Sequence, residues 1–261
     1  QIYGVGGTMS DKSDRDNKNR ALFEDHYAIM KKAWQGGTFT HKSDVWTIPP
    51  DNLEFNHSAI RDYGKGLGSD GMIKELGTAP QCYQKPHPQI FQPFSFSAST
   101  FEFCAREGIV PIAIATDDVI LDELLRTYQE TAATAGRKLK KGQGVGVFRD
   151  CLVGVDGNEA RNYARQANGF VWTNWFEPIG FNEAFRRKGQ TGEVPGGVDP
   201  LFDSGFEFVG TADEVNRQIE KMVKLHDPEY FVMWQYPGMI PHDYMMRSLE
   251  IWATDILPNW Q

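Results

Sequence analysis

The sequence has few cysteines, no excess of positive charge and no long apolar run. Its three cysteines, Cys82, Cys104 and Cys151, are odd in number and widely spaced, so they form neither a disulfide framework nor a zinc motif. With 27 basic against 35 acidic residues the net charge is −8, which argues against a nucleic-acid or anionic-membrane partner. The apolar runs are strand-sized, and the N-terminus lacks the basic head and apolar core of a signal peptide. We therefore expect a cytoplasmic protein that binds small molecules.

Nucleotide-binding loops are missing as well. No Walker loop occurs, and Gly4–Met9 lacks the last glycine of a G-x-G-x-x-G motif. What is present is a regular alternation of strand-like and helix-like segments, which predicts a parallel sheet with crossover helices, either doubly wound or closed into a barrel. The length of 261 residues suits one α/β barrel. Without a dinucleotide motif, the barrel is favoured by elimination, as one domain over residues 1–261.

Helix and strand signals divide the chain further. A capping-box pattern, Thr211 with Glu214, predicts the start of one helix. Residues 51–81 are rich in glycine and are expected to be a long irregular excursion, and Phe206–Val209 is expected to be only a short extended piece. The parallel strands are expected to begin at five apolar segments: Ile2, Ile90, Ile109, Val145 and Tyr230.

A run of small hydroxyl residues marks the first candidate site. Ser97, Ala98, Ser99 and Thr100 follow Phe96 at the end of a predicted strand and open a predicted helix. Backbone N–H groups at a helix N-terminus, together with hydroxyls, bind anions. The carboxyl ends of the strands also form the active face of a barrel. Serine and threonine are equally ordinary helix caps, so both interpretations stay open.

An aromatic, glycine-rich segment, residues 169–200, is the second candidate. We expect a lid or insertion there, because large apolar side chains beside glycine hinges can exclude water from a reaction. The alternative is a packed loop that buries its own aromatic residues. Trp234, at the end of the last predicted strand, could line the same site or pack in the core. The candidate lid residues are Trp172, Trp175, Phe176 and Phe181.

Five segments in chain order carry a resemblance to a known family. Ser97–Gly108 (SASTFEFCAREG) resembles the flavin-phosphate segment of bacterial luciferase-like monooxygenases, and Val209–Val215 (VGTADEV) resembles a helix start of that family. The others are the proline-rich approach Tyr83–Ile90, the final helix Arg247–Ala253, and the helix Asn19–Trp34 with the Gly36–Phe39 that follows it.

The resemblance implies a TIM barrel that binds reduced FMN, or F420 in a sister branch, and uses O₂ to oxygenate a small apolar organic substrate. A separate NAD(P)H:flavin reductase would supply the reduced flavin. Ser97 and Thr100 match the phosphate ligands, and Gly6 and Gly7 match a strand end beside the flavin ring. The helix that carries Phe23, Tyr27 and Met30 matches a dimer face, so a homodimer is possible.

The same resemblance implies that part of the barrel is missing. The five predicted strands match strands four to eight, and the first three βα units have no counterpart in this chain. We therefore expect the natural protein to continue upstream of Gln1, with the family's catalytic histidine there. The six histidines of this chain are isolated and are expected at the surface or in caps, and no metal site is expected. Three alternatives remain: a non-catalytic flavin-binding relative or partner subunit, an F420-dependent oxidoreductase, and an unrelated barrel that binds a sugar phosphate at Ser97–Thr100.

Overall fold

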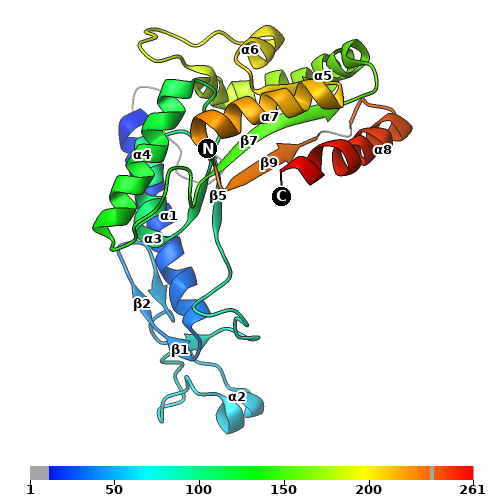
Figure 1. The fold of residues 1–261 in the computed structure, drawn as a ribbon. Coiled ribbons are helices and arrows are strands. Elements are labelled where there is room, and N and C mark those ends of the chain that lie inside the picture. Colours follow the sequence, from blue (N-terminus) through cyan, green and yellow to red (C-terminus); the bar gives the residue numbers. More distant parts are fainter. Residues whose placement is uncertain (1–11, 236–237, 261) are drawn as a thin grey trace. The chain divides into compact units, whose positions relative to one another are not determined.

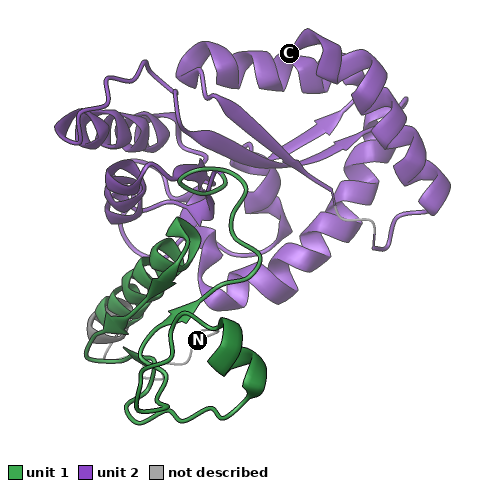
Figure 2. Ribbon diagram, turned by 90° about the horizontal axis from the view of Figure 1, so that it is seen from below, with its two compact units in different colours: residues 1–88 green, residues 89–261 purple. Residues whose placement is uncertain are grey.

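The computed structural model describes residues 12–235 and 238–260. The chain divides into two compact units, Gln1–Pro88 and Gln89–Gln261, which are coloured separately in Figure 2. The strand expected at Ile2 and the candidate residues Gly6 and Gly7 lie outside the described residues. No helix in the described part of the chain is long and apolar enough to cross a membrane.

The first unit has one long helix and a mostly irregular chain. The helix expected from residue 17 to Trp34 is confirmed, and it ends where Gly36 and Gly37 adopt positive φ angles of 88° and 77°. The excursion over residues 51–81 is largely irregular, as expected. The elements are α1 (Lys12–Gln35), β1 (Thr38–Phe39), β2 (His41–Lys42), β3 (Thr47–Ile48), α2 (Ser58–Tyr63) and β4 (Leu76–Gly77), with β1 antiparallel to β4 and β2 antiparallel to β3.

The second unit is built on a parallel sheet of five strands (Figure 1). The strands expected from Ile90, Ile109, Val145 and Tyr230 are all present. The fifth described strand comes from residues 207–210: the short extended piece expected there is confirmed, but leaving it out of the parallel strands is wrong, because it pairs with β7. The strands are β5 (Phe91–Ser95), β6 (Val110–Ala113), β7 (Gly146–Val153), β8 (Glu207–Gly210) and β9 (Tyr230–Trp234), in the order β5-β6-β7-β8 with β9 paired to β7.

Side-chain caps start the helices that follow four of these strands. Ser97, Asp117, Asp156 and Thr211 each accept a hydrogen bond from a backbone N–H of the first helical turn, and Thr211 forms the predicted capping box with Glu214. The helices of this unit are α3 (Ala98–Glu107), α4 (Asp118–Thr134), α5 (Gly157–Val171), α6 (Val198–Asp203), α7 (Ala212–His226) and α8 (His242–Ile251).

Helices cover both faces of the sheet. Successive side chains of a strand point to opposite faces. On β7, Leu152 packs with Ala160 and Ala164 of α5, whereas Arg149 lines a cavity with Met222 of α7. The crossover helices of a closed barrel all lie outside it. Within the described residues the sheet is therefore open, and the α/β class with a parallel sheet is confirmed while a closed barrel is not formed.

The aromatic segment is more regular than a loop. Helix α5 runs to Val171, a π-helical turn follows over Trp172–Phe176, and 3₁₀ turns follow over Glu177–Ile179 and Phe181–Phe185. Aromatic rings from these turns belong to the hydrophobic core of the sheet unit, where they pack with Ile112 and Phe148. The expectation of a loop throughout residues 169–200 is wrong for its first half, because these apolar side chains recur closely enough to stay helical and be buried.

Candidate functional site

The hydroxyl run lies where the sequence predicts, at the carboxyl end of β5 and the start of α3. The hydroxyl oxygen of Ser97 is 2.9 Å from that of Thr100 and 3.3 Å from that of Ser99. It also accepts a hydrogen bond of 3.4 Å from the backbone N–H of Thr100. Ser97 and Thr100 are half-buried, whereas Ser99 is exposed. Three hydroxyls and a helix N-terminus therefore share one small surface at the edge of the sheet.

Charge sets this helix N-terminus apart from the others in the sheet unit. The first turn of α3 contains no acidic residue. The helices that follow the other four strands each have at least one acidic residue in the first turn, so a carboxylate already offsets the positive end of their dipoles. Those acidic residues are Asp118 in α4, Glu159 in α5, Asp213 and Glu214 in α7, and Asp243 in α8. Of these five helix starts, α3 is thus the one suited to an external anion.

Phe94 links the hydroxyl run to a cluster of aromatic rings. The pairing of β5 with β6 shifts register between Gln92 and Ser95, and Phe94 adopts a left-handed φ of 53°. Such a conformation is costly for a bulky residue. Its ring centroid lies 5.4 Å from that of Phe148, 5.6 Å from Phe181 and 6.0 Å from Trp234. The irregular backbone thus holds Phe94 at the centre of the cluster.

The candidate lid residues separate into two groups. Phe176 and Phe181 join the cluster around Phe94, and Phe181 also lies 6.1 Å from Phe96, the residue before the hydroxyl run. Trp172 is only 3% exposed and donates a hydrogen bond of 2.8 Å from its indole nitrogen to Asn182, so it belongs to the core. Trp175 is 69% exposed and Trp234 is 36% exposed. Trp234 therefore presents one partly open ring beside the cluster.

A group of buried charged residues has no counterpart in the sequence expectations. Arg149 and Asp150 lie in β7, and Glu207, which pairs directly with Asp150, lies in β8; all three are buried. Burial raises the pKa of Asp150 to about 8 and that of Glu207 well above its ordinary value, because two neighbouring carboxylates cannot both ionise away from water. The signal in the sequence is the charged pair Arg149-Asp150 inside an otherwise apolar strand segment.

The histidines are less peripheral than expected. His57 does cap α2. His41 and His226, however, are buried: His41 lies 2.7 Å from a carboxylate oxygen of Asp25, and His226 lies 3.1 Å from Asp118. The expectation that all six are surface or capping residues is wrong for these two, since each has a carboxylate partner that offsets burial. Over residues 12–235 and 238–260, no three His, Cys, Asp or Glu side chains are placed to hold a metal ion.

Comparison with known proteins gives structural matches only. No protein-family model and no curated protein sequence matches the chain. Monooxygenase RslO1 from Streptomyces bottropensis superposes with a TM-score of 0.67 at 18% identity, over 98% of this chain and 67% of that one. The oxygenating constituent of 3,6-diketocamphane monooxygenase from Pseudomonas putida, solved with FMN, gives 0.64 at 18% identity, over 98% and 66%. EDTA monooxygenase from Chelativorans gives 0.54 at 14% identity, over 99% and 61%.

These matches establish the fold. The matched proteins have the luciferase-like barrel type of architecture, so the fold expected from the sequence resemblance is confirmed at that level. The chain spans about two thirds of the length of the first two matched proteins.

Proposed function

We propose that this chain is part of a flavin-dependent monooxygenase that uses reduced FMN and O₂ to oxygenate a small apolar organic substrate. The observation that carries the proposal is the N-terminus of α3, where three hydroxyls gather at a helix start free of acidic residues. The shared fold supports it, because a matched structure with the same fold was solved with FMN. The reduced state of the flavin, the O₂ and the substrate class belong to the proposal.

The residues at α3 fit a phosphate group. A phosphate accepts hydrogen bonds from hydroxyls and from the first backbone N–H groups of a helix, and it is favoured by the positive end of the dipole. We assign Ser97, Ser99 and Thr100 to hold the FMN phosphate through their hydroxyls, and Ala98 through its backbone. Ala98 is exposed and has no side chain that would block a ligand. Phe96 lies between this site and the aromatic cluster.

The aromatic cluster is suited to excluding water from the flavin and to binding an apolar substrate. Reduced FMN supplies the chemistry that activates O₂ when it is bound. The task of the protein is then to position the flavin and to keep water out. Trp234, with its partly open ring, together with Phe176 and Phe181 is suited to that task and to an apolar substrate. We assign Trp172 to the support of these rings and Trp175 to the exposed rim.

A separate reductase is part of the same proposal. One matched protein is named as the oxygenating constituent of a monooxygenase, which supports the supply of reduced flavin by a second component. An NAD(P)H:flavin reductase is the proposed source. A homodimer through the α1 residues Phe23 and Met30, which are both exposed, stays a proposal as well.

The proposal is tested by anaerobic titration of the protein with photoreduced FMN, followed by fluorescence. We expect Ser97→Ala to weaken binding by about tenfold, the equivalent of one charge-assisted hydrogen bond. Thr211→Ala is the matched control, because it removes the N-cap of α7, where Glu214 already occupies the helix start. Both variants lose about 1 kcal/mol of stability as caps, so only a difference in flavin binding reports on the site.

The other outcomes separate the alternatives. Binding of reduced F420 in place of reduced FMN would favour an F420-dependent oxidoreductase. Binding of reduced FMN with no oxygenation by the full-length protein would favour a non-catalytic relative or partner subunit. Equal affinity of Ser97→Ala and Thr211→Ala for reduced FMN would remove α3 from the proposed phosphate site.

A further inference from the structure

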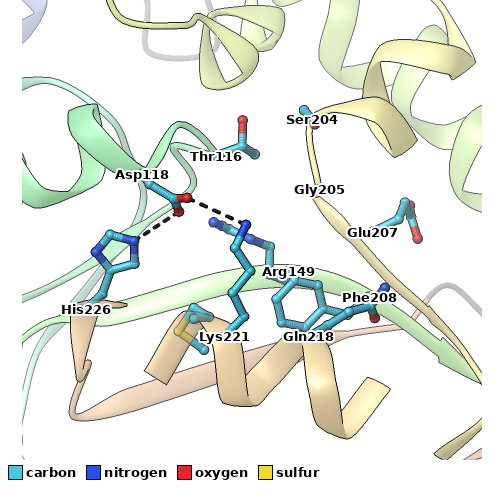
Figure 3. Close-up of a pocket in the computed structure, with 11 residues that line it drawn as sticks. Thr116, Asp118, Arg149, Ser204, Gly205, Glu207, Phe208, Gln218, Lys221 and His226 are labelled. Atoms are coloured by element: carbon cyan, nitrogen blue, oxygen red, sulfur yellow. Dashed lines mark hydrogen bonds and ion pairs between the residues drawn. The ribbon is translucent and has the colours of Figure 1, made fainter. Parts of the chain in front are cut away.

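A polar cavity of about 150 Å³ lies on the face of the sheet that α4 and α7 cover. Figure 3 shows its lining, with Arg149 from β7 among side chains of both helices. Neither the hydroxyl run at α3 nor the aromatic cluster contributes to it. Polar and charged side chains in its lining include Thr116, Asp118, Arg149, Gln218, Lys221 and His226.

The guanidinium of Arg149 is buried in this cavity without an anionic partner. Arg149 is 4% exposed. Its terminal nitrogens donate to two backbone carbonyl oxygens, of Phe148 at 2.7 Å and of Ala115 at 2.9 Å, and its Nε has no hydrogen-bond partner. No carboxylate among the described residues forms an ion pair with it. A buried charge without a counter-ion is strongly unfavourable.

The acidic groups nearest to Arg149 do not neutralise it. Asp118 is already engaged by Lys221, at 3.6 Å, and by His226, at 3.1 Å, as the dashed lines in Figure 3 show. The side chain of Glu207 points to the opposite face of the sheet from that of Phe208, whose ring lies 6.0 Å from the guanidinium. Burial also raises the pKa of Glu207 well above its ordinary value, which disfavours its charged form.

The formal charge of the cavity is therefore positive. Arg149 and Lys221 contribute two formal positive charges against the one negative charge of Asp118. Burial lowers the pKa of Arg149 only to about 10, so it stays charged at neutral pH.

We propose that this cavity is a binding site for a small oxyanion, in the size range of phosphate, sulfate or a short carboxylate. The guanidinium of Arg149 would supply positive charge from the bottom of the cavity, and the ammonium group of Lys221 would approach from its mouth, where Lys221 is 72% exposed. The volume corresponds to about five water molecules at water's share of liquid volume, which leaves room for such an ion. The site is separate from the proposed flavin site.

The test is calorimetric titration of the protein with inorganic phosphate against chloride at equal ionic strength, with sulfate and acetate as parallel arms. We expect phosphate to bind and chloride not to bind. Lys221→Gln is expected to weaken phosphate binding about threefold, as for an exposed charge. Arg149→Lys is expected to weaken it at least tenfold, because the ammonium cannot reproduce the planar fork. If acetate binds and phosphate does not, the ligand is a carboxylate.

Two controls keep the test specific. Lys224→Gln removes an equally exposed lysine, 71% exposed and one turn along α7, and should bind phosphate like the unmodified protein. Thr100→Val alters the proposed flavin site, so any part of the phosphate signal that this variant loses is assigned to that site and the remainder to the cavity. If Arg149→Lys fails to fold, Lys221→Gln decides alone. The inference is overturned if no oxyanion binds better than chloride, if Lys221→Gln binds like the unmodified protein, or if Thr100→Val abolishes the response.

Discussion

The buried carboxyl pair of the sheet makes a specific prediction about how stability depends on pH. Asp150 and Glu207 are directly paired across β7 and β8, and both are buried. One oxygen of Glu207 accepts from the amide of Asn168 at 3.0 Å, and its other oxygen has no partner among the described donors. A proton on one of the two carboxyl groups supplies the missing donor. The folded protein is therefore expected to hold at least one proton that the unfolded chain releases.

The direction follows from the raised pKa values. Unfolded aspartate titrates near 4, whereas the folded-state pKa of Asp150 is about 8. The stabilisation from the bound proton is complete below about pH 4 and is lost as the pH rises towards about 8. Across that window each such proton makes the free energy of unfolding fall by about 1.4 kcal/mol per pH unit.

Glu207→Gln reduces this dependence. The substitution removes one of the two carboxyl groups that hold a proton in the folded protein, so the slope becomes shallower by about 1.4 kcal/mol per pH unit, while burial keeps the pKa of Asp150 raised. Urea unfolding between about pH 5 and pH 8 measures both slopes. Glu193→Gln, which removes an exposed carboxylate, is the control and should keep the original slope. Equal slopes for Glu207→Gln and the unmodified protein would refute the shared proton.

Three further substitutions test the core and the helix cap near the candidate site. Trp172→Ala should lower the free energy of unfolding by about 3–5 kcal/mol because it empties a core position. Trp175→Ala, at an exposed ring, should change the free energy of unfolding by less than about 0.5 kcal/mol. A similar loss in both variants would contradict the assignment of Trp172 to the core. Gly108→Ala should cost about 1–2 kcal/mol of backbone strain, because Gly108 ends α3 at a φ of 73° and an added Cβ would meet only Nη1 of Arg137, at an ordinary contact distance of 3.8 Å. An unchanged urea midpoint would argue against this cap.

Local signals in the sequence predict much of the sheet unit. The end of α3 follows from Gly108, the start of α4 from Asp117 and the start of α7 from Thr211 with Glu214, because caps and left-handed glycines act over a few residues. The hydroxyl run also falls where the pattern places it. These features depend on neighbours in the chain, and a single sequence contains that information.

Features that depend on distant contacts are not predictable in the same way. β8 is four residues long and is defined by its pairing with β7, so no periodicity indicates it. The side chains of Asp150 and Glu207 come together only through that pairing. The burial of His226 likewise depends on Asp118, which lies 108 positions away. Long-range pairings of this kind decide where the buried charges lie, and the pattern of one sequence does not show them.

The most direct test of the account is hydrogen–deuterium exchange of the protein with and without reduced FMN under anaerobic conditions. The account predicts slower exchange of the backbone amides at the start of α3, residues 98–101, when the flavin phosphate binds there. The starts of α4 and α7, where carboxylates already occupy the helix ends, should be unaffected. Reduced FMN that binds without protecting residues 98–101, or that does not bind at all, would contradict the proposed site.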